Sequence, residues 1–168
     1  EDEVVLIAIN EGDKPILGTL QLGYLSYDGK EKAMRTVDFL VPARSCKLLA
    51  TYPLPDKEQL EVGTVVAIPQ GETLFEPVSF RHTQFRNTGI AEAEVRIEEK
   101  AVCGNDLKVT VCSQTFAHAV HFLIPSDYRL SDHYFDLLPG EKRTITIYGG
   151  AELGPDLRAR SVGCRGKG

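Results

Sequence analysis

Short extended segments recur along the chain, and turn residues separate them. In the first half these segments cover residues 4–10, 18–27, 36–41, 46–52, 63–68 and 73–80. Asp28-Gly29, Pro42 and Pro53-Leu54-Pro55 are among the breaks between them. Alternation with period two is typical of half-buried strands, and spacings of about 8 to 12 residues without a long helical pattern favour a β-sandwich.

The first half also contains a predicted helical turn, a predicted edge strand and the linker to the second half. Residues 56–60 follow Pro55 and predict a single helical turn. Pro77 lacks a backbone donor, so the run 73–80 is expected to be an edge or exit strand. Residues 81–91 are mostly polar, contain Asn87-Thr88-Gly89 and lack alternation, which places the linker there. We therefore expect one domain at residues 1–86 and a second at 87–168.

The second half repeats the pattern in runs at residues 92–100, 107–113, 119–124, 143–148 and 157–162. Gly104-Asn105 predicts a two-residue hairpin loop, which would place Cys103 opposite Asp106 and Cys112 opposite Ile97. Several short strands over such a length are typical of a small immunoglobulin-like domain. The predicted fold class is all-β, as two tandem antiparallel immunoglobulin-like β-sandwich domains.

An acidic and aromatic corner, residues 131–141, precedes the strand at 143–148. Pro139-Gly140 suits a type II turn, because Pro presets φ and Gly supplies the positive φ that comes next. Tyr134 and Phe135 should point to opposite sides, one of them into the core. Asp132 and Asp136 are expected to accept backbone N–H bonds. We interpret Asp132, Tyr134, Phe135, Asp136, Pro139 and Gly140 as a structural corner motif.

This corner, running through Phe135-Asp136-Leu137-Leu138-Pro139-Gly140-Glu141 into a Thr/Ile strand, closely resembles the C-terminal immunoglobulin-like domain of β-mannosidases of glycoside hydrolase family 2. Residues 107–113 and 119–124 resemble that domain's second and third strands. Residues 1–86 resemble the preceding sandwich through strand rhythm and the turn at residues 27–30.

The resemblance implies a non-catalytic accessory region, a C-terminal fragment of a β-mannosidase-like glycoside hydrolase. The parent's catalytic glutamates would lie in a (β/α)8 barrel upstream, so no catalytic residue carries over to this chain. The implied partners are the catalytic barrel and the N-terminal domains of the same parent chain, with a homodimer interface as a further option. Related enzymes acting on glucosaminides or galactosides carry similar sandwiches, so the parent's substrate stays open.

Composition excludes several other classes. Apolar and charged residues make up 42% and 26% of the chain, as in ordinary globular proteins. The net charge of −5 comes from scattered charges, which argues against nucleic-acid binding, and Arg158, Arg160, Arg165 and Lys167 suggest a solvated end. No apolar run approaches the roughly 18 residues of a membrane span. The start at Glu1 suggests a cut between domains, which leaves the compartment open: cytoplasmic, periplasmic, secreted or lysosomal.

Cysteine and histidine spacing predicts neither disulfides nor a metal site. The hairpin register keeps Cys103 from facing Cys112, Cys46 falls in the other domain, and Cys164 is the fourth cysteine, so we expect free thiols. The histidines, His82, His118, His121 and His133, lack the paired spacing of zinc ligands. His118 and His121, three apart, should point to opposite faces of a strand. No cofactor is expected.

Two other functions remain as alternatives. Asp132, His133, Tyr134 and Asp136 could suggest the carboxylate pair of a glycosidase, but such a pair needs a concave, partly dry pocket, and a strand-to-turn corner is convex. A carbohydrate-binding or adhesion sandwich is the second alternative. It would need exposed aromatic platforms, for which the chain offers no Trp and only Tyr24, Tyr27, Tyr52 and Tyr148 as candidates.

Overall fold

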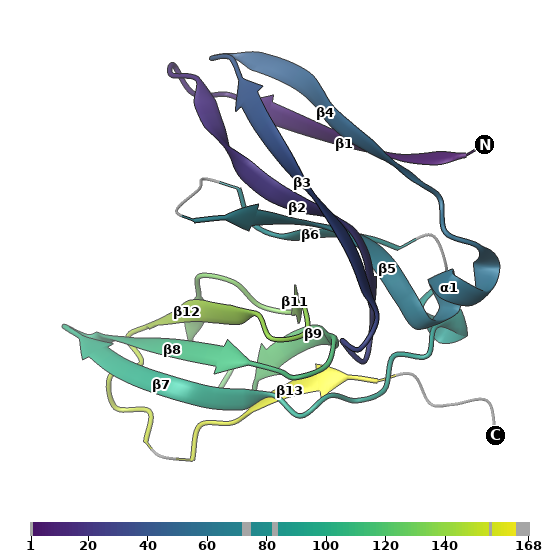
Figure 1. The fold of residues 1–168 in the computed structure, drawn as a ribbon. Helices are drawn as coiled ribbons and strands as arrows, with labels where there is room; N and C mark the ends of the chain where they lie inside the picture. Colours follow the sequence, from purple (N-terminus) through teal and green to yellow (C-terminus); the bar gives the residue numbers. More distant parts are fainter. Residues whose placement is uncertain (1, 72–74, 82–83, 155, 164–168) are drawn as a thin grey trace. The chain divides into compact units, whose positions relative to one another are not determined.

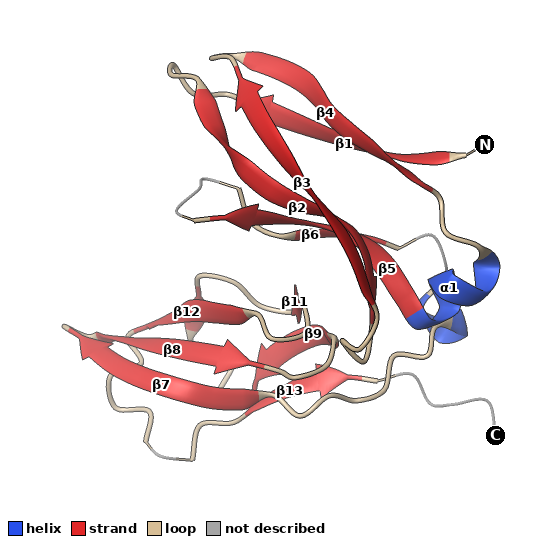
Figure 2. Ribbon diagram, in the orientation of Figure 1, coloured by secondary structure: helices blue, strands red, loops and turns tan. Residues whose placement is uncertain are grey.

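The computed structural model describes residues 2–71, 75–81, 84–154 and 156–163. They fall into two compact units: unit 1 comprises Glu1–Ser26 and Lys30–Gln84, and unit 2 comprises Tyr27–Gly29 and Phe85–Gly168. Antiparallel strands dominate both units (Figure 2), which confirms the predicted all-β class. No helix among the described residues has the length and apolarity to cross a membrane.

Unit 1 consists of two antiparallel sheets (Figure 1). The larger sheet has the strand order β3-β2-β5-β6, and β1 pairs with β4 in the smaller one. The strands are β1 (Glu3–Asn10), β2 (Ile16–Ser26), β3 (Lys32–Val41), β4 (Ser45–Pro53), β5 (Gly63–Gln70) and β6 (Val78–Phe80). β6 is an edge strand directly after Pro77, as predicted; the predicted start of that run, Thr73, lies outside the described residues.

Alternation builds the core of unit 1. Every second residue of a strand faces the opposite sheet, and the resulting cluster draws on four strands. Its buried members are Ala8, Leu20, Leu22, Phe39, Val41, Val65 and Ala67. The predicted helical turn is also present, as α1 (Lys57–Val62), which begins with a capping box between Asp56 and Gln59. This box satisfies two backbone donors at the start of a short helix.

Unit 2 also has two antiparallel sheets, ordered β10-β12-β8-β7 and β11-β9-β13. Its strands are β7 (Arg96–Cys103), β8 (Asp106–Cys112), β9 (Ala117–Phe122), β10 (Arg129–Leu130), β11 (Phe135–Leu137), β12 (Lys142–Tyr148) and β13 (Ala159–Val162). A 3-10 helix covers Phe85–Asn87. The core between the sheets includes Val109, Val111, Val120, Phe135, Leu137, Ile145 and Ile147.

The β7–β8 hairpin differs from prediction in its register. Cys103 lies opposite Asp106, as the loop predicts, but Cys112 lies opposite Arg96 and not Ile97. The pairing shifts between Ile97 and Glu99, where one extra residue forms a β-bulge. A bulge adds a residue to one strand only, so a register counted from the turn is wrong by one beyond it.

Candidate functional site

The predicted corner turns the chain from β10 into β11 and places two adjacent aromatic rings in opposite surroundings. Phe135 is 6% exposed and belongs to the core of unit 2, whereas Tyr134 is 62% exposed. Tyr134 has a φ of 60°, in the left-handed region that residues other than glycine rarely adopt. Phe135 therefore anchors the corner in the core.

Arg143 connects the corner to β12. Its guanidinium lies 4.9 Å from the centre of the Phe135 ring and 2.8 Å from Asp132 Oδ2. The other carboxylate oxygen, Asp132 Oδ1, accepts a hydrogen bond from the backbone N–H of His133 at 2.7 Å. The guanidinium thus combines a cation–π contact with an ion pair. Arg143 was not singled out by sequence reasoning, since one Arg at the start of a strand carries no motif.

Asp136 holds the corner against β9. Its Oδ1 lies 2.7 Å from His118 Nδ1 and accepts a hydrogen bond from the backbone N–H of Ala119 at 3.0 Å. The backbone of β9 is irregular at Ala119, which has a φ of 49°. Ala117 and Val120, on either side of it, are both fully buried although they lie three apart. Regular alternation is therefore interrupted, and the predicted placement of His118 and His121 on opposite faces does not hold.

Pro139 and Gly140 form the turn that leads into β12. Gly140 has a φ of 79°, and the N–H of Glu141 donates to Leu138 O at 2.9 Å, as in a type II turn. Glu141 Oε2 in turn accepts the backbone N–H of Leu138 at 2.8 Å. Gly140 N also donates to Ser113 O at 2.8 Å, which ties the turn to the end of β8.

These contacts decide what the corner can do chemically. Asp132 is engaged by Arg143 and by the backbone N–H of His133, and Asp136 is engaged by His118 and Ala119. A glycosidase pair needs one carboxylic acid and one free carboxylate aimed at a shared substrate. Both carboxylates instead fasten backbone and side chains of unit 2, so the geometry favours a structural role.

A cluster of rings covers the outside of the corner. His121 stacks on Tyr134 with ring centres 5.3 Å apart, and His133 meets Tyr134 edge-on at 4.3 Å. Burial, with a smaller electrostatic contribution from His121, lowers the pKa of His133 below its ordinary value of 6.5. This shift favours the neutral imidazole. Among the described residues no three His, Cys, Asp or Glu side chains form a group that could hold a metal ion; His82 lies outside them.

The tyrosines named as sugar platforms are mostly inside the protein. Tyr24 and Tyr27 are 5% and 6% exposed, so they cannot stack on a ligand. Tyr52 packs against the core of unit 1, and the Tyr148 ring has the Arg129 guanidinium 5.0 Å from its centre. Tyr148 is 40% exposed, so at least two of the four named tyrosines cannot serve as sugar platforms and the four do not form one flat surface.

The described cysteines are free thiols in unlike settings. Cys46 and Cys103 are exposed and Cys112 is buried, which confirms the expectation for these three; Cys164, Arg165 and Lys167 lie outside the described residues. The thiol of Cys112 donates to Glu98 Oε1 at 3.1 Å, and Glu98 also pairs with Lys142. Burial first, and then the Glu98 carboxylate, raise the pKa of the Cys112 thiol, so it is a poor nucleophile at neutral pH.

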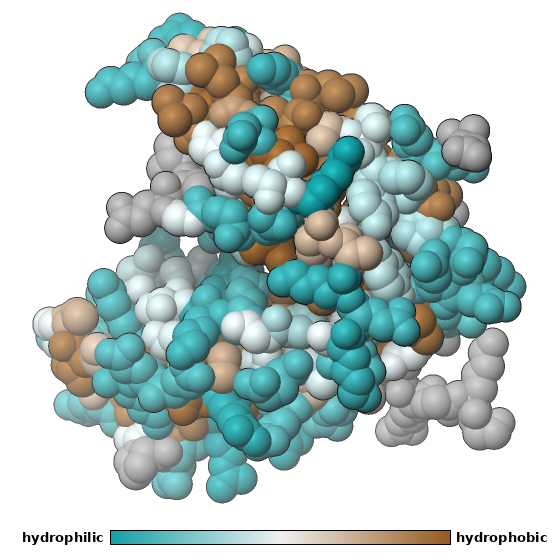
Figure 3. Space-filling view, viewed as in Figure 1, coloured by the Kyte–Doolittle hydropathy of each residue, from teal (hydrophilic) through white to brown (hydrophobic). Residues whose placement is uncertain are grey.

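Unit 1 carries an apolar surface on the smaller sheet. In β1 the apolar side chains that do not face the core are Val5, Ile7 and Ile9, which are 48%, 54% and 63% exposed. Leu48 of β4 lies opposite Ile7 and is 56% exposed. We name these four residues the outer face. Figure 3 shows apolar residues gathered over the β1–β4 end of unit 1. Large contiguous exposed apolar surface is a common feature of interaction sites.

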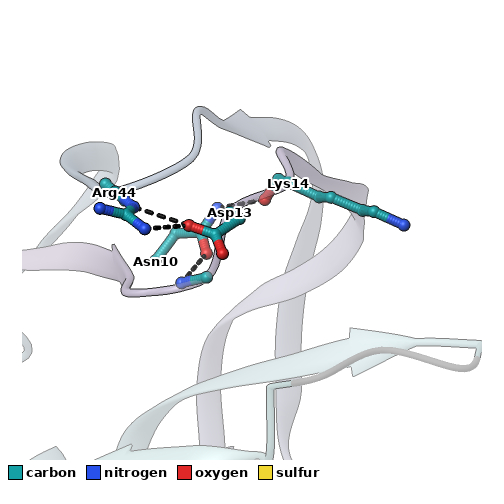
Figure 4. A network of polar contacts seen from close by, with 5 residues as sticks. Asn10, Asp13, Lys14 and Arg44 are labelled. Atoms are coloured by element: carbon teal, nitrogen blue, oxygen red, sulfur yellow. Dashed lines mark hydrogen bonds and ion pairs between the residues drawn. The ribbon is translucent and has the colours of Figure 1, made fainter.

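A buried amide fixes the loops at one end of this sheet (Figure 4). Asn10 is 3% exposed, and its Nδ2 donates to the carbonyls of Lys14 and Pro42 at 2.8 and 2.9 Å while its Oδ1 accepts Gly12 N at 3.0 Å. Arg44, with a φ of 50°, pairs with Asp13. These bonds join the β1–β2 and β3–β4 connections, so β1 and its outer face are held at a defined position.

The fold defines a class: antiparallel immunoglobulin-like sandwiches. Residues 85–163 match the family model Ig_mannosidase, described as an Ig-fold domain. This part of the chain is therefore similar to the immunoglobulin-like domain that this model describes.

One solved structure with the same fold is the β-D-mannosidase from Dictyoglomus thermophilum. Its TM-score is 0.76 at 17% sequence identity, and the match covers 97% of this chain but only 20% of that protein. A search of curated proteins finds no match. The chain thus spans about a fifth of a mannosidase with which it shares its fold, and the described residues form sandwiches without a (β/α)8 barrel.

Proposed function

We propose that this chain is a non-catalytic accessory region of a β-mannosidase-like glycoside hydrolase of family 2. The observation that carries the proposal is the match of residues 85–163 to the mannosidase immunoglobulin-like family. The fold shared with a β-D-mannosidase five times as long agrees with it. In this account the hydrolytic residues belong to a catalytic barrel elsewhere in the parent polypeptide.

The accessory work is mechanical: the outer face packs against another domain of the parent. Val5, Ile7, Ile9 and Leu48 expose apolar surface that costs free energy in water, about 25 cal/mol for each Å². Burying it against the catalytic barrel or an N-terminal domain would stabilise both partners. A surface in an obligate contact is expected to be apolar in this way.

Leu48→Lys in the full-length polypeptide tests this packing. Leu48 is 56% exposed in this chain, so the charge should change the stability of the isolated 168-residue protein by no more than about 0.5 kcal/mol. In the parent it would enter an apolar contact, and the half-life of thermal inactivation should fall about threefold or more. Activity against an aryl β-mannoside before and after heating provides the measurement.

The matched control is Val102→Lys in β7, at an apolar residue that is 61% exposed but not part of the outer face. It should leave the half-life unchanged. Equal half-lives for L48K and the unsubstituted parent would contradict the proposal. So would a dimer of the isolated chain that L48K converts to a monomer in light scattering, because the outer face would then bind a second copy.

A further inference from the structure

One long side of unit 1 is open along β1. Among the described residues β1 pairs with β4 alone, so no described strand hydrogen-bonds to its other edge. In an antiparallel strand every second residue directs its N–H and C=O to one edge. The eight residues Glu3–Asn10 therefore offer a row of backbone donors and acceptors to an added strand.

An apolar groove runs beside this edge, between β1 and the far sheet. It consists of two hollows of about 370 and 130 Å³, and both have β1 on one side and β5 and β6 on the other. Leu6, Ala67 and Val78 line both hollows. Since an apolar cavity of about 150 Å³ accepts a benzene molecule, the larger hollow has room for roughly two apolar side chains.

On the opposite side of unit 1, two basic side chains bridge the sheets. There β3 and β4 face each other, and Lys47 Nζ donates to Leu40 O at 2.8 Å. The Arg35 guanidinium of β3 likewise donates to Thr51 O of β4. Polar bridges thus connect the two sheets on that side, whereas on the β1 side the free strand edge borders an apolar floor.

We propose that an extended segment of the parent polypeptide, N-terminal to this chain, adds to the free edge of β1 as an antiparallel strand and seats alternate apolar side chains in the groove. This inference rests on the proposed function, which supplies the longer chain. Strand addition pairs backbone groups and fills pockets at every second residue. Consecutive strands are neighbours about two-thirds of the time, so a segment that leads into β1 through a short turn is the favoured source.

Charge argues against a second copy of β1 as the occupant. If two copies paired antiparallel about the middle of the strand, Asp2 of one would lie opposite Glu11 of the other, and both residues are exposed acids. Like charges placed directly opposite each other destabilise a strand pair. A neutral or basic segment meets no such repulsion.

Hydrogen exchange tests the inference on the 168-residue protein and on the full-length polypeptide from the same gene. The peptide covering residues 3–10 should exchange at least about tenfold more slowly in the full-length protein. Val78→Lys in the full-length protein should restore fast exchange, because it puts a charge into the groove. Val78 is 53% exposed, so the isolated chain should tolerate the change. Leu17→Lys is the control, at a residue 71% exposed that does not line the groove.

Equal exchange of residues 3–10 in the two proteins would overturn the inference, as would protection in the full-length protein that V78K leaves intact. Protection that develops in the isolated chain as its concentration rises would also overturn it, by assigning the edge to a second copy. The comparison does not depend on catalysis. A full-length protein without mannosidase activity would refute the proposed function, while the exchange of β1 would still report whether a strand is added.

Discussion

Phe135→Ala is expected to destabilise unit 2 by about 3 to 5 kcal/mol. Phe135 is 6% exposed, pairs with Val120 across β11 and β9, and lies under the guanidinium of Arg143. Truncation leaves a cavity in the core and removes the ring that the guanidinium contacts. Urea unfolding followed through the amide NMR signals of residues in unit 2 would measure the loss, because those signals report that unit alone.

Tyr134→Ala is the matched control, since it removes the neighbouring ring from the same corner. Tyr134 is 62% exposed and has a φ of 60°, a conformation that is unfavourable for tyrosine and for alanine alike. We expect a change of less than about 1 kcal/mol, from the lost ring contacts with His121 and His133. Similar losses for the two variants would show that Phe135 does not anchor the corner.

Gly23→Ala is expected to destabilise unit 1 by about 3 kcal/mol, at the upper end of the overpacking range. Gly23 lies opposite Met34 and Val66 in the middle of β2, between β3 and β5. A Cβ there would overlap Ala33 O and approach Met34 Cα to 2.8 Å. Both are backbone atoms of the neighbouring strand, so β2 and β3 would have to separate. The amide signals of unit 1 during urea unfolding give the measurement.

Gly154→Ala provides the comparison, because an added Cβ at that position meets no atom within 4 Å. Its φ lies outside the left-handed region, so alanine adopts it without strain. A change within about 0.5 kcal/mol is expected. If G23A proved as mild as G154A, the close approach of β2 and β3 would be wrong.

The longer strands could be predicted from the sequence because short apolar-rich segments and the turn residues between them are local signals. β1, β5 and β12 begin within a residue or so of the predicted runs, and the Gly104-Asn105 loop gave the correct first pair of its hairpin. β10 and β11 were missed, since two or three residues cannot show a period. The bulge near Glu98 was missed too, because an extra residue in one strand leaves no mark in the pattern.

The candidate site was predictable only in part. Aromatic and acidic residues in sequence located the corner, and its turn followed from Pro139-Gly140. Arg143, His118 and Asn10 reach their partners from other strands or loops, and such contacts depend on tertiary packing. One signal for the groove was present: β1 is apolar at six consecutive positions, residues 4–9, and a continuous apolar run is typical of a strand covered on both faces.

Hydrolysis of an aryl β-mannoside, assayed for the 168-residue protein and for the full-length polypeptide side by side, tests the central claim most directly. The account predicts turnover by the full-length protein and only the background rate for the isolated chain, because Asp132 and Asp136 are held by Arg143 and His118. Hydrolysis by the isolated chain above background, abolished by Asp132→Asn or Asp136→Asn, would contradict it.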